Sequence, residues 1–271
     1  MIFAVHIADG VLTLPWTVTG LAIGSLLIAL SSIRVRDTEI PRIGLFAAAI
    51  FVGSQLHIPL GISSVHLLLN GIAGLALGRR APLAIAVGLA LQSLLFAHGG
   101  KLAYGINLIV LTVPALITAG IAPCLDQLNN HRIKIILVSI AISLWLALIV
   151  ITLQIVIWKF KDLSPREWLD DPSPMWIRHP VAWICLGIAG IVAARKVPSR
   201  WAIGLLLGGG CATLTVLLNV VAVRFGGLEG IRSAAVITLF AHLPVIAIEA
   251  IATAVIRPFI VVASPPAPPS G

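Results

Sequence analysis

The sequence has very little charge. Only 10% of its 271 residues are charged, against about 25% in an ordinary soluble domain, while 59% are hydrophobic. The mean hydropathy of +1.09 excludes a surface that faces water on all sides. Because a transmembrane helix takes roughly 17–25 mostly apolar residues, several such helices would use most of the chain and leave no soluble catalytic domain.

The motifs of common catalytic sites are also missing. The sequence contains no HExxH, GxSxG, P-loop or Rossmann glycine run, so nothing supports a zinc peptidase, a serine hydrolase or a nucleotide-binding protein. Cys124, Cys185 and Cys211 have no CxxC spacing and are interpreted as buried small apolar residues. The net charge of +8 comes without an arginine-rich stripe, which argues against nucleic acid. We expect neither an enzyme nor a catalytic cofactor.

Long apolar runs separated by charges, prolines and glycines predict about nine helical segments. They are Trp16–Ile33, Ile43–Ile58, His66–Leu77, Pro82–Ala97, Ile106–Ala122, Ile135–Trp158, Val181–Ala194, Trp201–Val223 and Ala234–Ile256. Small residues spaced four apart, as at Gly20 and Gly24, are interpreted as ordinary helix packing. The proline-rich end, residues 263–271, is expected to be extended and disordered, after a single transmembrane domain over residues 1–262.

The distribution of basic residues predicts the orientation in the membrane. If the N-terminus lies outside and every segment crosses, eleven basic residues fall inside: Arg34, Arg36, Arg42, Arg79, Arg80, Arg132, Lys134, Arg195, Lys196, Arg200 and Arg257. Seven fall outside: Lys101, Lys159, Lys161, Arg166, Arg178, Arg224 and Arg232. The bias favours an outer N-terminus and an inner C-terminus.

Two segments, His66–Leu77 and Val181–Ala194, are short for a full crossing at 1.5 Å per residue. The first lies within a stretch bounded by Gly61 and Gly78. Irregular backbone at membrane depth has to be buried in protein or to line a cavity. The third segment is therefore predicted to form the functional site.

Polar groups within apolar segments are costly and mark candidate site residues. These are His6, Asp9, His57, His66, Gln92, His98, Asn107, His242 and Glu249, with Ser64 beside His66. Simpler readings stay open: Asp9-Gly10 is also a turn signal, and a lone histidine is more often hydrogen-bonded structure than a ligand. His242 and Glu249 share one helical face and are assigned a structural or proton-relay role.

Four blocks of the sequence, in the same order along the chain, resemble the motifs of one family. His6-Ile7-Ala8-Asp9-Gly10, Ser64-Val65-His66-Leu67, Gln92 to Asn107, and His242 to Thr253 resemble successive motifs of the CbiM/NikM family, the substrate-binding membrane subunits of energy-coupling-factor transporters for cobalt and nickel. Together these cover roughly residues 5–125 and 200–257. The resemblance implies an all-α integral membrane bundle of about seven family helices, here with a two-helix insertion at about residues 133–200.

The resemblance also implies a metal site. In the family the metal is held by the N-terminal amine, the backbone nitrogen and imidazole of the adjacent histidine, and a second histidine from the third segment; here these would be His6 and His66. A square of nitrogen donors suits Ni²⁺, with Co²⁺ admissible. Asp9, Ser64, Gln92, His98 and Asn107 would support the ligands from outside the first coordination shell.

One departure from the family pattern concerns the start of the chain. Met1 to Ala4 precede Val5, so an amine at Met1 lies too far from His6 for the fused chelate. Four residues are too few for a signal peptide. We therefore expect Val5 to be an alternative initiation site that supplies the N-terminal amine.

The resemblance further implies Co²⁺ or Ni²⁺ as transported substrate, in a role related to cobalamin biosynthesis when it is cobalt. The partners would be a coupling (T) membrane subunit, cytoplasmic ABC-type ATPases and an accessory small membrane subunit, in the cytoplasmic membrane of a bacterium or archaeon with its lipid. Arg79 and Arg80 are candidate contacts for the coupling subunit. The alternatives are a proton-coupled secondary transporter working through Glu249 and His242, and a membrane metalloenzyme using His57, His66 and His98.

Overall fold

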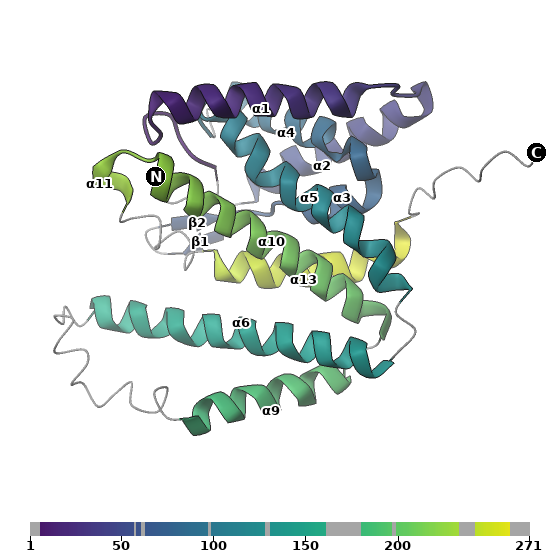
Figure 1. The fold of residues 1–271 in the computed structure, drawn as a ribbon, viewed down its shortest axis with the longest axis vertical. Helices are drawn as coiled ribbons and strands as arrows, with labels where there is room; N and C mark the ends of the chain where they lie inside the picture. Colours follow the sequence, from purple (N-terminus) through teal and green to yellow (C-terminus); the bar gives the residue numbers. More distant parts are fainter. Residues whose placement is uncertain are drawn as a thin grey trace, which may run out of the picture.

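The computed structural model describes residues 6–56, 58–60, 63–96, 99–127, 131–160, 180–196, 199–232 and 242–260. Their elements, drawn in Figure 1, are α1 Leu14–Ser32, η1 Asp37–Glu39, α2 Ile40–Gln55, β1 Ile58–Leu60, β2 Ser63–Val65, α3 Asn70–Leu77, η2 Gly78–Arg80, α4 Ala81–Phe96, α5 Tyr104–Asp126, α6 His131–Phe160, α9 Pro180–Lys196, α10 Ser199–Gly226, α11 Glu229–Arg232, α13 Leu243–Ile256 and η3 Arg257–Phe259. Each of the nine predicted apolar segments overlaps one of these helices.

The multi-pass helical fold predicted from hydropathy is confirmed. Among the described residues, four stretches are long and apolar enough to cross a membrane: Leu14–Ser32, Asn70–Phe96, Tyr104–Asp126 and Trp201–Gly226. Many large apolar side chains on the helices are exposed, as expected of surfaces that meet lipid. The main core lies among α2, α3, α4, α5, α10 and α13.

The third predicted segment, His66–Leu77, becomes helical later than the sequence predicts. The helix begins at Asn70 rather than at His66, and residues 66–69 have no regular secondary structure. Leu69 has φ +54°, a left-handed conformation that a leucine rarely adopts and that an α-helix cannot continue through. Ahead of this stretch, β1 and β2 form a short antiparallel hairpin, so Ile58 is not helical either. The prediction that this helix is too short to cross alone is confirmed, since eight residues rise only about 12 Å.

α3 is a half-length helix that starts inside the bundle. The Asn70 side chain bonds to the carbonyl of Leu111, and Gly74 packs on Ala115, so α3 runs in the direction of α5. Leu111 lies seven residues beyond Tyr104, which places the start of α3 about 10 Å along α5. Gly78, at φ +54°, then allows the chain to turn into α4.

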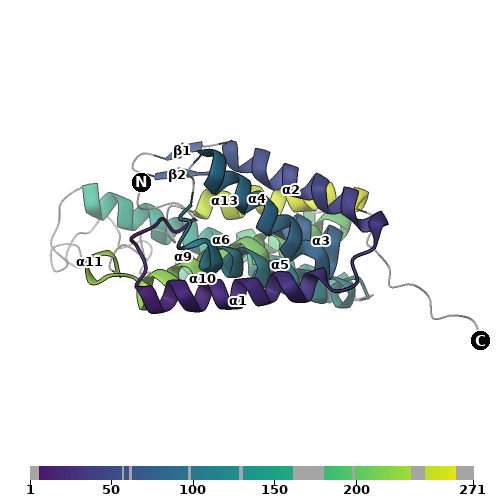
Figure 2. The same ribbon diagram turned by 90° about the horizontal axis from the view of Figure 1, so that it is seen from above.

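Segments that the charge distribution predicts on the same side of the membrane lie at the same end of the bundle. At one end Thr13 N–H donates to the Gly226 carbonyl and Gly100 N–H to that of Ile7. Figure 2 shows β1 and β2 at this same end as the segment before α1. At the other end lie Arg80 with the end of α1, and the Asp126–Arg257 ion pair. We refer to these as the histidine end and the arginine end; that the former faces outside stays a prediction.

α6 and α9 form a hairpin on the side of the bundle farthest from α1 (Figure 1). Trp145 of α6 packs on Gly209 of α10, where any side chain would clash. Cys211 is buried as predicted, but Cys124 and Cys185 are exposed. The prediction of burial was wrong for these two because an apolar run does not show which helix face meets lipid.

Candidate metal centre

The described structure brings His6 and His66 into contact at the histidine end. Their ring centroids lie 4.8 Å apart and the ring planes are 19° from parallel. Both residues are buried, with 5% and 2% of their surface exposed. Two imidazoles from distant parts of the chain therefore share one enclosed position, as the resemblance implies they should.

The backbone next to His6 is held by Asn107 at the start of α5. The Asn107 Oδ1 accepts the Ile7 N–H at 2.8 Å, and its Nδ2 donates to the Ile7 carbonyl at 2.9 Å. This carbonyl also accepts the Gly100 N–H at 3.0 Å. Gly99 lies beside the His6 side chain at φ +76°, a conformation that glycine allows. These contacts fix the position from which the His6 ring extends.

Asp9 joins the same N-terminal segment to the loop before α5. Its carboxylate accepts the backbone N–H groups of Lys101, Leu102 and Ala103 at 2.9, 2.7 and 3.2 Å. Lys101 and Leu102 precede α5 and Ala103 is its N-cap, so the carboxylate lies beside the helix N-terminus, where a negative charge is stabilising. Asp9 thus holds the loop that packs against His6. The turn predicted at Asp9-Gly10 is also present, since Gly10 has φ +81°.

Glu249 holds the stretch that carries His66. One carboxylate oxygen accepts the N–H groups of Leu68 and Leu69 at 2.5 and 3.0 Å, and the residue is 1% exposed. The His66 Nδ1 lies 3.0 Å from the Leu67 carbonyl oxygen. Hydrogen bonds to a carboxylate are stronger than neutral ones, so Glu249 fixes the non-helical backbone just after His66. This contact favours the structural role over the proton relay for Glu249.

The remaining predicted residues are spread between described and undescribed parts. Gln92 is buried in α4, and its Oε1 has no hydrogen-bond partner among the described residues. His242 is buried directly before α13. Ser64 lies in β2, where only the backbone is described. Val5, His57 and His98 lie outside the described residues, as do the proline-rich end and the loop between α6 and α9, residues 161–179.

Sequence reasoning missed the buried Asn70 and misjudged Arg80. Asn70 donates to the Leu111 carbonyl at 3.0 Å and to Thr215 Oγ1 at 2.9 Å. The criterion that selected Asn107, a polar residue in an apolar run, would also have found Asn70. Arg80 was expected on an inner loop surface but is 2% exposed, because the carbonyls at the end of α1 surround its guanidinium. It is therefore not a contact for a partner; Arg79 is exposed.

The described residues contain no cluster of three or more His, Cys, Asp or Glu side chains that could hold a metal ion. Imidazole nitrogens such as those of His6 and His66 are donors suited to nickel, with cobalt admissible.

Spanning helices with two buried, contacting imidazoles at one end define a multi-pass membrane protein with a candidate metal site. The chain belongs to the CbiM family, described as "Cobalt uptake substrate-specific transmembrane region", whose pattern matches residues 6–169. This match extends past the first three motif blocks through α6 and stops before α9. The family is one of metal transporters and not of enzymes, which removes the metalloenzyme alternative.

Curated relatives agree with this assignment. The chain is 42% identical over 112 residues to a "Putative metal transport protein" of Haemophilus influenzae, a stretch that is 41% of this chain and 54% of the relative. It is 31% identical over 119 residues to the "Cobalt transport protein CbiM" of Geobacter sulfurreducens, covering 41% of this chain and 34% of that protein. A "Putative fused nickel transport protein NikMN" of Archaeoglobus fulgidus is 38% identical over 105 residues, with 38% and 36% covered. The matches thus span about half or less of each relative.

A solved structure, described as a transition metal transporter, has the same fold. It superposes with a TM-score of 0.51 at 18% identity, covering 94% of this chain and 91% of the other. The similarity includes the chain's C-terminal half, which the family pattern does not reach.

Proposed function

We propose that this protein is the substrate-binding subunit for uptake of Co²⁺ or Ni²⁺ across the cytoplasmic membrane, in an energy-coupling-factor system. The observation that carries the proposal is the contact between the buried rings of His6 and His66. Metal–imidazole bonds are about 2.0–2.1 Å long, so two ligand nitrogens on one ion lie at most about 4.2 Å apart. Rings in contact can meet that requirement.

The proposed ligand set is the N-terminal amine, the backbone nitrogen and imidazole of His6, and the imidazole of His66. The amine would belong to Val5, if translation starts there. Asn107, Gly100 and Asp9 would then hold the N-terminal chelate by its backbone, and Glu249 would do the same for the second imidazole. Supporting groups of this kind orient the ligands and tune metal affinity. His98, Gln92 and Ser64 remain proposed supporting groups.

The metal content of the purified protein tests this proposal. Protein produced with both cobalt and nickel in the medium should retain a stoichiometric amount of one of them, which also decides the substrate. His66→Ala should lose it, whereas His131→Ala, at the start of α6, should not. Retention of the metal by a folded His66→Ala variant would refute the site. Intact mass determination tests Val5, since a mature chain that keeps Ile2 to Ala4 cannot form the proposed chelate.

The energy source is a separate part of the proposal. In an energy-coupling-factor system, uptake would depend on a coupling subunit and cytoplasmic ATPases, with an accessory small membrane subunit as a further proposed partner. Cellular uptake of radioactive cobalt or nickel should stop when the ATPase genes are deleted. Uptake that persists without them, and that collapses with the proton gradient, would instead favour a secondary transporter.

A further inference from the structure

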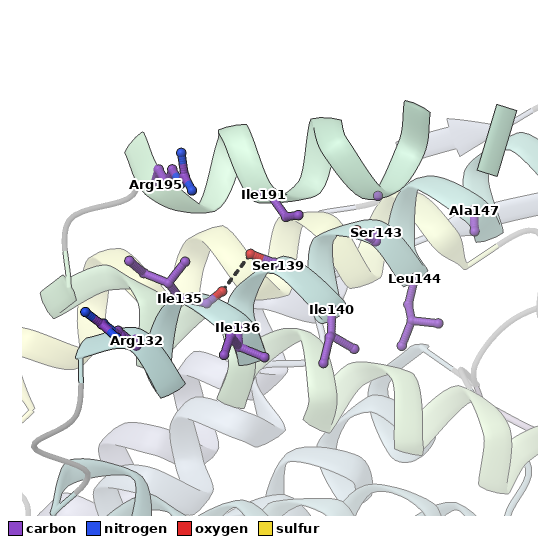
Figure 3. Close-up of a pocket in the computed structure, with 11 residues that line it drawn as sticks. Arg132, Ile135, Ile136, Ser139, Ile140, Ser143, Leu144, Ala147, Ile191 and Arg195 are labelled. Carbon is purple, nitrogen blue, oxygen red and sulfur yellow. Dashed lines mark hydrogen bonds between the residues drawn. The ribbon is translucent and has the colours of Figure 1, made fainter. Parts of the chain in front are cut away.

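A groove of about 730 Å³ lies between α6 and α9, on the part of the molecule that carries no predicted site residue. Eleven residues line it: Arg132, Ile135, Ile136, Ser139, Ile140, Ser143, Leu144, Ala147, Gly187, Ile191 and Arg195. Figure 3 shows the isoleucines and the leucine along its length and both arginines at one end.

The two helices make the groove by approaching closely at one glycine and separating at another. At Gly190 an added side chain would clash with Ser143 of α6, so the helices are in contact there. At Gly187, nearly one turn earlier, an added Cβ would have nothing within 4 Å. The opposite face of α6 packs on α10, with Val138 1% exposed. The groove therefore opens away from the bundle, toward lipid.

The groove walls are apolar along their length. Ile136 and Leu144 are 55% and 59% exposed. The Ser139 hydroxyl donates to the Ile135 carbonyl of its own helix at 2.7 Å (Figure 3), so it adds little polarity. From Arg132 to Ala147 the groove follows α6 for about 22 Å. One leaflet of the hydrocarbon core is about 15 Å thick, so an extended acyl chain fits this length.

The charge at one end identifies the headgroup. Arg132 and Arg195 lie at the arginine end of the bundle, and Lys134 and Lys196 lie on the same helix ends. Neither α6 nor α9 contains an aspartate or glutamate. Basic clusters between transmembrane helices bind anionic headgroups, and arginine binds phosphate through paired N–H donors.

We infer that this groove binds an anionic phospholipid, with its phosphate between Arg132 and Arg195 and one acyl chain along Ile136, Ile140 and Leu144. The site is independent of the metal site, and its failure would leave the proposed transport function untouched. It would anchor the α6–α9 hairpin in the bilayer by a specific lipid.

Native mass spectrometry of the full chain tests the inference. The protein is reconstituted in vesicles with equal amounts of phosphatidylglycerol and phosphatidylcholine. It is then released from the vesicles, and the lipid that stays bound to it is identified by its mass. The wild type should retain phosphatidylglycerol preferentially, and the R132Q/R195Q variant should lose that preference by roughly tenfold or more. The control R34Q/R79Q removes the same charge from exposed arginines at the same end, and it should keep the preference for phosphatidylglycerol.

A second pair of variants tests the groove itself. Gly187→Leu fills the groove and should reduce retained lipid, whereas Gly120→Leu, at an open position on α5, should not. Equal retention in R132Q/R195Q and its control, or in Gly187→Leu and its control, would overturn the inference. If Gly187→Leu keeps its lipid but no longer co-purifies with another membrane subunit, a protein helix occupies the groove, and the lipid assignment is wrong.

Discussion

The two ends of the bundle use buried polar side chains in the same way but to different effect. At the histidine end, Asn107, Asp9 and Glu249 form hydrogen bonds with backbone groups near His6 and His66. The two imidazole rings lie in contact between these supports. At the arginine end Arg80 donates to the carbonyls of Ser31, Ile33 and Arg34 and to Glu39. One end holds two imidazoles in contact, where we propose that an ion binds, whereas the other end ties helix ends to each other. Burial of a polar group alone therefore does not distinguish a site from a structural support.

The largest effect on stability should come from Arg80→Met. Its side chain is 3% exposed, and its loss leaves several carbonyls and the Glu39 carboxylate without their donor. Each buried carbonyl that loses its donor costs about 1–3 kcal/mol, and the Ser31 carbonyl is such a group. Chemical unfolding in detergent should show this loss, while surviving folded protein binds metal normally. Arg79→Met, at an exposed position, should change little. Equal stability of the two variants would contradict the buried network.

Glu249→Ala should weaken metal binding most among the variants that keep both histidines. Without the carboxylate the N–H groups of Leu68 and Leu69 lose their acceptor, and His66 is no longer held. Loss of such supporting groups costs about 10–100-fold in metal affinity. Glu249→Gln keeps an amide oxygen that can accept and should lose less. A metal titration in which both variants match the wild type would remove Glu249 from the site.

Comparing Asn107→Leu with Asn70→Leu tests whether the loss of metal binding is specific to the histidine end. It replaces the buried amide that pairs with both backbone groups of Ile7, and we expect about tenfold weaker metal binding and a loss of about 1–3 kcal/mol of stability. Asn70→Leu removes another buried amide, bonded to Thr215 at mid-depth, and should lower stability alone. If both variants weaken metal binding equally, the effect is general loosening and not positioning.

The smallest effect concerns Glu39. The Arg36 backbone N–H and then the Arg80 guanidinium lower the pKa of this carboxyl below its usual value of 4.5. A lowered folded-state pKa contributes stability above the unfolded-state value, and this contribution is lost as the pH falls through the folded-state pKa. Unfolding midpoints of the wild type and Glu39→Gln should thus differ at pH 7 and converge as the pH falls through the folded-state pKa of Glu39, below 4.5. A constant difference across this range would contradict the ion pair with Arg80.

Hydropathy alone predicts most of the helices, because α1, α5, α10 and the stretch from α3 through α4 are long and apolar enough to cross a membrane. It fails at residues 66–69, where the decisive interaction is with a carboxylate 181 residues further along the chain, and at Arg80, whose charge looks like a loop anchor. The meeting of His6 and His66 follows from no periodicity; only the family motifs indicate it. Local sequence carries helix propensity, whereas tertiary contacts decide which polar residues touch.

X-ray absorption spectroscopy of the cobalt- or nickel-loaded protein tests whether His6 and His66 hold the ion. The wild type should show a first shell of nitrogen donors, with the scattering signature of two imidazoles. Glu249→Gln should retain this signature, while any metal bound weakly by His66→Ala should show one imidazole fewer. A wild-type shell with sulfur, with mostly oxygen donors, or with the same imidazole number after His66→Ala would contradict a site built on His6 and His66.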